Sequence, residues 1–242
     1  MERQGGIAIW RQIADQMRGE ITAGRFGSGM RLPPEVALAE RFGVNRHTVR
    51  SAIAALTQEG VLRAEQGRGT FVADARRLKY PIGRRTRFSE GLASQTRETK
   101  SILLEERIET AHGEVAEALN LGAGVDDVIR LETVSTADGR PVSRATSWFV
   151  RAQAPDIAAD YATSGSITAA LKAAGIDDYF RRSTIISAYH ADAGDLRHLK
   201  LAPGAIVLMA KAINVDREGN PVEFAMTRFA ADRMELSIDN PR

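Results

Sequence analysis

Residues 44–72, VNRHTVRSAIAALTQEGVLRAEQGRGTFV, constrain the fold of this chain most, because they predict a helix with two distinct faces followed by a β-hairpin. One face is apolar at positions i, i+3, i+4 and i+7: Val49, Ala52, Ile53 and Leu56. The other face carries Arg46, His47 and Arg50. Asn45, directly before them, is favoured as a helix N-cap. The helix macrodipole disfavours cations in a first turn, so we expect an anionic partner outside the protein, and duplex DNA supplies one.

The hairpin that follows has a glycine-rich tip. Residues 61–65 and 70–72 are strand-like, and the tip between them contains Gly67, Arg68 and Gly69. Such a tip can approach a phosphate backbone or enter a minor groove, where arginine is favoured. An ordinary helix and hairpin with solvated arginines would give the same pattern in isolation. The neighbouring segments are therefore needed to distinguish it from a DNA-binding surface.

Two further helices are predicted before this stretch. The first covers residues 8–23, with apolar residues repeating near every fourth position, and Trp10 is assigned to the same buried stripe. The second starts at Pro34, carries Glu35 in its first turn and ends at Gly43. Helix, short helix, tight turn, helix and hairpin is the order of a winged helix-turn-helix domain, in which the second helix of the pair enters the major groove.

The charge is unevenly distributed along the 242 residues. Residues 1–74 carry 10 basic and 8 acidic side chains, residues 75–100 carry 8 and 2, and residues 101–242 carry 15 and 21. We therefore expect a DNA-facing N-terminal domain at 1–74, a connection at 75–85 and an acidic body at 86–242. The chain has no cysteine and no long apolar segment, so we expect a cytoplasmic protein without disulfides and without a membrane partner.

The N-terminal part resembles a known family. The string LPPEVALAERFGVNRHTVRSAIAALTQEGVLRAEQGRGTFV is similar to the DNA-binding domain of the GntR family of bacterial transcription regulators. The resemblance implies DNA contacts from Arg46, Thr48, Arg50 and Gly67, and we add His47, Arg68 and Gly69 to the predicted surface. His47 and Val36 depart from residues common in the family, which leaves the operator sequence open.

The predicted DNA contacts differ in role. An arginine such as Arg46 or Arg50 can pair bidentately with guanine, while Thr48 and backbone amides suit phosphate. One such domain buries too little surface for an operator, so we expect a homodimer on a palindromic site of double-stranded DNA.

The segment that follows is rich in arginine. ARRLKYPIGRRTRF, from residue 75, has few periodic apolar positions, as expected of a connection near DNA, although a solvated linker explains most of its charges equally well. Arg87, Phe88 and Ser89 place an aromatic ring between a cation and a hydroxyl, and we expect them to close over a ligand.

The remainder of the chain contains an internal repeat. The segments LNLGAGVDDVIRLETVSTADGRPVSRATSWF, from Leu119, and LKLAPGAIVLMAKAINVDREGNPVEFAMTRF, from Leu199, align without gaps at an offset of 80 residues. Each predicts a short helix, a strand, a tight turn and a second strand. With a helix at 166–174 and a strand at 180–190, this half is an α+β domain built on an antiparallel sheet.

This half resembles the UTRA effector-binding domain of the HutC branch of the family, which implies a chorismate-lyase-like fold and a role of residues 86–242 in dimerisation as well as in effector binding. NRHT, YPIGRRTRFSEGL and FRRSTIISA look most like regulators of phosphonate metabolism. The resemblance implies an effector site at Arg87, Phe88, Ser89, Thr133, Ser135, Ser166, Glu223 and Phe229. Arg144, Arg182 and Arg228 are further cations for an anionic effector, although each could instead be an ion-paired surface residue. Strand alternation also points Arg144 and Arg228 away from the face of Ser147 and Phe229.

A chorismate-lyase-like enzyme is the alternative from another class. The four histidines, His47, His112, His190 and His198, have no metal-ligand spacing, and no nucleophile and base pairing is visible. We therefore expect no catalytic residues, no metal and no cofactor. The expected function is a ligand-responsive transcription regulator, a repressor with a phosphonate or phosphate-ester effector. A sugar-phosphate or amino-acid-derived effector, and an activator or architectural DNA binder, stay open as alternatives.

Overall fold

The computed structural model describes residues 8–65, 67–73, 77–85, 87–122 and 127–239, apart from the side chains of residues 89 and 90. The chain divides into two compact units, Met1–Arg76 and Arg77–Arg242, each of which is described by itself.

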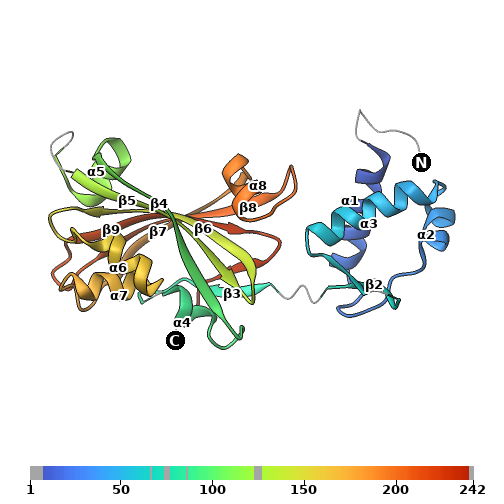
Figure 1. Ribbon diagram of the computed structural model, residues 1–242, viewed down its shortest axis with the longest axis horizontal. Helices are drawn as coiled ribbons and strands as arrows, with labels where there is room; N and C mark the ends of the chain where they lie inside the picture. Colours follow the sequence, from blue (N-terminus) through green and yellow to red (C-terminus); the bar gives the residue numbers. More distant parts are fainter. Residues whose placement is uncertain (1–7, 66, 74–76, 86, 123–126, 240–242) are drawn as a thin grey trace. The chain divides into compact units, whose positions relative to one another are not determined.

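The first unit is a winged helix-turn-helix domain, as predicted (Figure 1). Its elements are α1 (Ile9–Thr22), α2 (Glu35–Phe42), α3 (Arg46–Gln58), β1 (Leu62–Glu65) and β2 (Gly69–Val72). The core includes Ile13 and Met17 from α1, Leu38 from α2, and Val49 and Leu56 from α3. The predicted apolar stripes therefore face one another, which is what holds α3 in place.

Two sequence expectations for this unit need correction. Trp10 is 37% exposed, although it lies only about 20° from Met17 around the helix, because it belongs to the first turn of α1 and the buried residues of this helix begin at Ile13. Pro34 is the N-cap of α2 rather than its first helical residue. Gly43 ends α2 as expected, in the left-handed conformation at φ 64° that glycine adopts without strain.

The second unit is built on a six-stranded antiparallel sheet. Its strands are β4 (Thr99–Thr110), β5 (Asp127–Ala137), β6 (Arg140–Val150), β7 (Phe180–His190), β8 (Ile206–Val215) and β9 (Pro221–Ala230). Their order across the sheet is β4-β5-β6-β9-β8-β7, so β4 and β7 are the two edges. The helices α5 (Gly113–Leu119) and α8 (Ala193–His198) lie on one face, and α6 (Ile157–Ser164) and α7 (Ile167–Ala173) lie on the other (Figure 1).

The internal repeat is present and is longer than the sequence alignment indicated. Gly113 and Ala193, which begin α5 and α8, are 80 residues apart, and the hairpins β5–β6 and β8–β9 follow in the same way. The edge strands β4 and β7 precede the two copies, so each copy is strand, helix, strand, strand. The copies meet where β6 pairs with β9, at the centre of the sheet.

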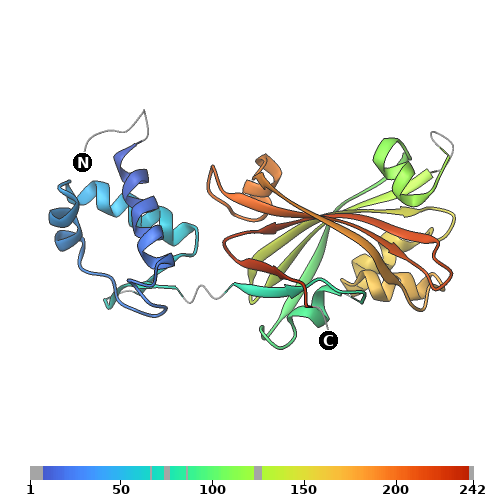
Figure 2. The ribbon, with the colours of Figure 1, turned by 180° about the vertical axis from the view of Figure 1, so that it is seen from behind.

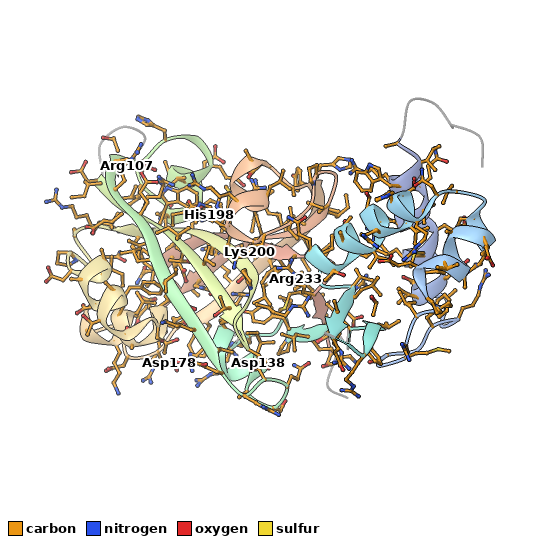
Figure 3. All side chains as sticks on the ribbon, turned by 45° about the vertical axis from the view of Figure 1, so that its right-hand side comes forward. Arg107, Asp138, Asp178, His198, Lys200 and Arg233 are labelled. Carbon is orange, nitrogen blue, oxygen red and sulfur yellow. The ribbon has the colours of Figure 1, made fainter. Side chains whose placement is uncertain are left out.

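The turn between β5 and β6 is the predicted Asp-Gly turn. Asp138 and Gly139 have φ of 48° and 76°. The Asp138 carboxylate accepts the backbone N–H groups of Arg97 and Glu98 at 2.9 and 3.0 Å, which ties the turn to the beginning of β4. Figure 3 shows Asp138 at this end of the sheet and Arg107 toward the other end of β4.

The expected connection at 75–85 contains a strand instead. β3 (Leu78–Pro81) pairs in parallel with β10 (Met234–Ser237), near the end of the chain, and α4 (Phe88–Leu92) follows it. Tyr80 of β3 is buried against Phe229. This strand was not predicted, because its alternation of apolar residues is short and arginines surround it. The helix α6 was not predicted either. Residues 77–85 therefore belong to the second unit.

Candidate DNA-binding surface and ligand cavity

The first turn of α3 is fixed by its cap. The side-chain oxygen of Asn45 accepts the backbone N–H and the hydroxyl of Thr48, both at 2.9 Å. This is the N-cap geometry that the sequence predicted. Arg46, His47 and Arg50 are exposed beside it.

Glu35 of α2 holds the two arginines of this surface. Arg50 donates to its carboxylate from Nε at 3.2 Å and from Nη2 at 2.9 Å, and Arg46 Nη2 lies 3.8 Å away. The hydrogen bond from Arg50 lowers the pKa of Glu35, so the carboxylate stays charged. Glu35 was expected only as a first-turn acid. It also orients the guanidinium groups of Arg46 and Arg50, which were predicted to contact DNA bases. Because one carboxylate faces two guanidinium groups, this part of the exposed surface keeps a net positive charge.

The hairpin tip carries more cations than predicted. Gly67 and Gly69 have φ of 74° and 114°, so a side chain at either position would be strained. Arg68 pairs with Glu65 at 2.6 Å and lies 5.8 Å from the ring centre of Phe71. Arg31, which precedes α2, packs against Gly69, since an added Cβ there would lie 2.8 Å from its Nε. Arg31 was not predicted as part of this surface, because it lies far from the hairpin along the chain.

The second unit contains a cavity of about 310 Å³ on the α6 and α7 side of its sheet. Seven of the predicted effector residues line it: Arg87, Phe88, Thr133, Ser135, Ser166, Glu223 and Phe229. The side chain of Ser89 lies outside the described residues. The elements that supply this lining are distant in sequence, and the sheet brings them together.

Glu223 is a buried acid in the cavity wall. Ser147 Oγ donates to one carboxyl oxygen at 2.8 Å, and Asn214 Nδ2 donates to the other at 2.6 Å. Burial raises the pKa of Glu223, against the effect of these hydrogen bonds and of the Arg181 charge. Burial therefore shifts the balance of Glu223 toward the neutral form relative to an exposed glutamate, and a neutral carboxyl group can donate a hydrogen bond to a ligand oxygen.

Two arginines line the same cavity. Arg87 lies 3.4 Å from Asp178 and 5.2 Å from the ring centre of Tyr179. Arg181, at the beginning of β7, is partly buried, and its Nε has no hydrogen-bond partner in the described part of the chain. Arg182, which was predicted from the sequence in place of Arg181, is exposed. A bulge between Arg181 and Ser183 shifts the strand register here, so alternation could not identify the inward arginine.

Hydroxyl groups supply most of the remaining polar lining. Ser101 Oγ and Ser135 Oγ lie 2.7 Å apart, and Thr168 Oγ1 lies 2.8 Å from the Tyr179 hydroxyl. Ser143, Ser147, Ser164, Ser166, Thr99, Thr133 and Thr227 add further hydroxyls. Burial raises the pKa of Tyr80, Tyr161 and Tyr179, so these phenols stay protonated and can donate. The cavity suits a small ligand with several oxygen atoms and a negative charge.

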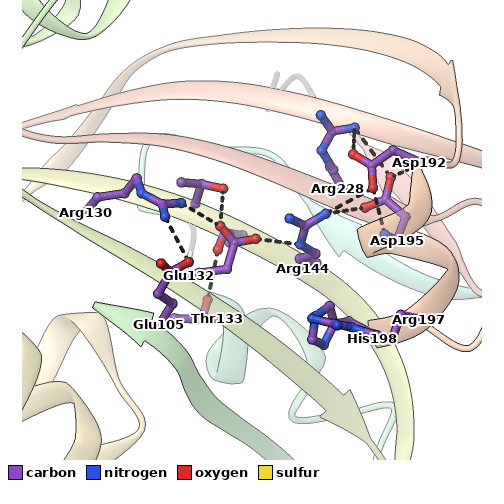
Figure 4. Close-up of polar contacts among 12 residues, drawn as sticks. Glu105, Arg130, Glu132, Thr133, Arg144, Asp192, Asp195, Arg197, His198 and Arg228 are labelled. Atoms are coloured by element: carbon purple, nitrogen blue, oxygen red, sulfur yellow. Dashed lines mark hydrogen bonds and ion pairs between the residues drawn. The ribbon is translucent and has the colours of Figure 1, made fainter. Parts of the chain in front are cut away.

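Arg144, which was predicted as an effector residue, does not line this cavity. It lies on the opposite face of the sheet, where it pairs with Glu132 and with the α8 carboxylates of Asp192 and Asp195, at 3.2 and 3.3 Å (Figure 4). Arg228 pairs with Asp195 at 3.4 Å in the same network. Strand alternation places both arginines on this face, and the ion pairs attach α8 to the sheet.

The described residues offer no group of three or more His, Asp or Glu side chains that could hold a metal ion. Within the same residues, no helix is long and apolar enough to cross a membrane.

A winged helix-turn-helix unit joined to a unit with a polar ligand cavity defines a transcription regulator with its own ligand-binding domain. The comparisons with known families agree with this class. Residues 10–72 match the family described as bacterial regulatory proteins, gntR family, and residues 94–235 match the UTRA domain. This chain therefore belongs to the GntR family of transcription regulators, in its HutC branch.

Individual relatives extend over nearly the whole chain. An uncharacterised HTH-type transcriptional regulator of Rhizobium meliloti is 52% identical over 239 residues, covering 99% of this chain and 98% of the relative. The probable transcriptional regulator PhnF of Escherichia coli is 30% identical, covering 96% and 95%. The crystal structure of PhnF from Mycobacterium smegmatis covers 97% of this chain and 99% of its own at a TM-score of 0.64 and 24% identity, which is a likeness of fold.

Proposed function

We propose that this regulator is a homodimeric repressor that binds a palindromic operator and releases it when a small anionic metabolite, a phosphonate or a phosphate ester, occupies the cavity. The observation that carries this proposal is the pair of arginines, Arg87 and Arg181, beside the buried acid Glu223 in one polar cavity.

The chemistry of the cavity fits a phosphonate or phosphate group. Guanidinium groups bind such anions through paired, charge-assisted hydrogen bonds. A neutral Glu223 would donate to a phosphoryl oxygen instead of repelling it. A volume of about 310 Å³ is at the small end of the range for ligand pockets, which favours a metabolite of few atoms.

The same cavity supports a second candidate ligand. Ten serine and threonine residues line it, and hydroxyl-rich walls also suit a sugar phosphate. Both candidates share the anionic group, and they differ in whether a polyol is attached to it. The repressor mechanism is the same for either.

The DNA side of the proposal uses α3 and the hairpin tip. Arg46 and Arg50 supply guanine contacts, Thr48 and His47 lie beside them, and Gly67, Arg68 and Gly69 approach the backbone or the minor groove. Half-sites about 34 Å apart, or a multiple of that, then require two copies of the chain.

Ligand binding and DNA binding are linked along the chain. β3, the first strand after the DNA-binding unit, places Tyr80 in the cavity wall, where it packs 5.1 Å from Phe229 and 6.1 Å from Phe88 between ring centres. A ligand that moves Arg87 or Phe88 therefore acts on the segment that leads to α3. A difference in affinity between two states worth about 1–3 kcal/mol is enough for such coupling.

The test is binding of the protein to the DNA upstream of its own gene at fixed salt, measured by fluorescence anisotropy. Methylphosphonate, 2-aminoethylphosphonate, glycerol 3-phosphate, glucose 6-phosphate and inorganic phosphate are added in turn, with neutral glucose as the control. Release by one phosphonate or phosphate ester supports the proposal, and which one acts decides between the two candidates. DNA binding that no probe changes would overturn the anionic-effector proposal.

A further inference from the structure

One carboxylate joins the ligand cavity to the segment that follows β3. Asp178, labelled in Figure 3, lies between α7 and β7 in the sequence, and its side chain is 10% exposed. Arg85 Nη2 lies 2.8 Å from one of its carboxylate oxygens, and Arg87 Nη2 lies 3.4 Å from the other. Arg87 lines the cavity, whereas Asp178 lies outside its lining. The acid therefore holds Arg87 from outside the cavity.

The residues just after β3 are docked on the start of β7 by further contacts. The N–H of Arg181 donates to the carbonyl of Arg84 at 2.9 Å. The guanidinium groups of Arg84 and Arg85 lie 4.7 and 4.8 Å from the ring centre of Phe180. Figures 1 and 2 both show the chain running from β3 toward the end of the sheet where α7 lies. The wall of the cavity at Arg181 and the connection to β3 are thus one packed unit.

The contact of Asp178 with Arg87 is the replaceable one. Its 3.4 Å is long for a charge-assisted hydrogen bond, whereas the 2.8 Å to Arg85 is ideal. Arg217 supplies a third guanidinium at 3.9 Å. Taking the partner away from a buried charge is costly when the charge is left unpaired. Asp178 keeps Arg85 and Arg217 when Arg87 turns away, so this cost is avoided.

We propose that Asp178 is an internal anion that holds Arg87 before the effector binds, and that the anionic group of the effector takes Arg87 from it. A phosphonate or phosphate group offers a guanidinium paired hydrogen bonds, which the single contact with Asp178 does not. The exchange removes one of the contacts that dock the segment after β3. Asp178 thereby sets the affinity for the effector and links its binding to that segment. This inference rests on the anionic effector of the proposed function.

The exchange has a definite thermodynamic sign. A ligand anion has to displace Asp178 from Arg87, so the carboxylate lowers the affinity for the ligand. A neutral side chain at this position removes the competitor, and the affinity should rise. If Asp178 instead oriented Arg87 toward the cavity, the same substitution would lower the affinity. The direction of one change therefore separates competition from positioning.

The first test compares Asp178→Asn with the wild type by isothermal titration calorimetry on the full chain. Methylphosphonate, 2-aminoethylphosphonate, glycerol 3-phosphate and glucose 6-phosphate are the probes. For a probe that binds the wild type, the dissociation constant should fall by about three- to tenfold, the size of one hydrogen bond. The matched control is Asp177→Asn, which removes the same charge from an exposed neighbour and should change the constant by less than about twofold. Weaker binding by Asp178→Asn, or equal changes in the two variants, would overturn the exchange.

The second test asks whether the effect acts through Arg87. Asp178→Asn is repeated in an Arg87→Gln background, where Arg181 still supplies a cation for the probe. Competition for Arg87 then no longer exists, so the added substitution should change the dissociation constant by less than about twofold. A merely structural effect of Asp178→Asn would be the same in both backgrounds, and that result would contradict the proposal.

The outcomes separate this inference from the proposed function. A wild type that binds none of the anionic probes overturns the proposed anionic effector and this inference with it. A wild type that binds a probe and releases operator DNA, while Asp178→Asn behaves as Asp177→Asn does, retains the proposed function. In that case only the assignment to Asp178 fails.

Discussion

Replacing Arg181 tests whether the cavity binds an anion. In the described residues, Arg181 Nε is buried without a hydrogen-bond partner, and a ligand oxygen would supply that partner. Hydrogen bonds to charged groups contribute about 1.5–3 kcal/mol, so Arg181→Gln should raise the dissociation constant of the active probe by about 10- to 150-fold. Isothermal titration calorimetry with the probe that releases DNA measures this constant.

The neighbouring residue is the matched control. Arg182 has the same charge and is exposed, so Arg182→Gln removes the same long-range field without touching the cavity. We expect a change of less than about threefold, as for an exposed charge. Operator affinity without ligand should be the same for both variants. Equal losses of ligand affinity in the two variants would refute the reasoning, because the effect would then come from net charge.

Three further predictions concern stability and DNA binding. Burial raises the pKa of Glu223 in the folded chain, so the wild type should lose stability relative to Glu223→Gln as the pH rises from about 4.3 through that raised pKa. Urea unfolding at pH 4.5, 6 and 8 measures this, and a difference in unfolding free energy between the two proteins that stays constant with pH would contradict it. Gly194→Ala should cost less than about 1 kcal/mol in urea unfolding, because its Cβ would lie 2.4 Å from Arg144 Nη1, the far end of a flexible side chain that can shift at the expense of partly exposed ion pairs. Gly19→Ala, with open space around it in α1, should stabilise by about 0.5–1 kcal/mol. Arg46→Gln should weaken operator binding by about 1–3 kcal/mol and relax the preference at one base pair, measured by anisotropy on singly substituted operators; equal weakening on every operator would instead indicate a phosphate contact.

Local signals in the sequence were enough for the first unit. The caps at Asn45 and Gly43 and the apolar stripe of α3 are short-range features, and the structure has them where the pattern predicted. The burial of Trp10 was predicted wrongly, because periodicity fixes the direction of a helical side chain and not what covers it. Trp10 lies on the same side of α1 as Met17, but in the first turn, before the buried residues of the helix begin at Ile13.

The second unit was harder to predict wherever pairing is long-range. The Asp-Gly turn at Asp138 identified its hairpin, but β3 pairs with β10 across more than half the chain and has only four residues. Its local pattern is too short to separate a strand from a charged linker.

The cavity was predicted in part for a related reason. Residues on strands with regular alternation, such as Thr133 and Glu223, were identified as lining it. Arg181 was missed because it lies beside a bulge, where a change of register decides which of two adjacent arginines points inward.

The measurement that tests the central claim most directly is the affinity of the active probe for the free regulator and for its operator complex, by calorimetry at the same salt and pH. Coupling is reciprocal, so a ligand that releases DNA must bind the operator complex more weakly than the free protein, by the same factor by which it weakens operator binding. We predict a difference of about 5- to 150-fold. Equal affinity for the two forms would mean that the cavity does not control DNA binding, and would contradict the account.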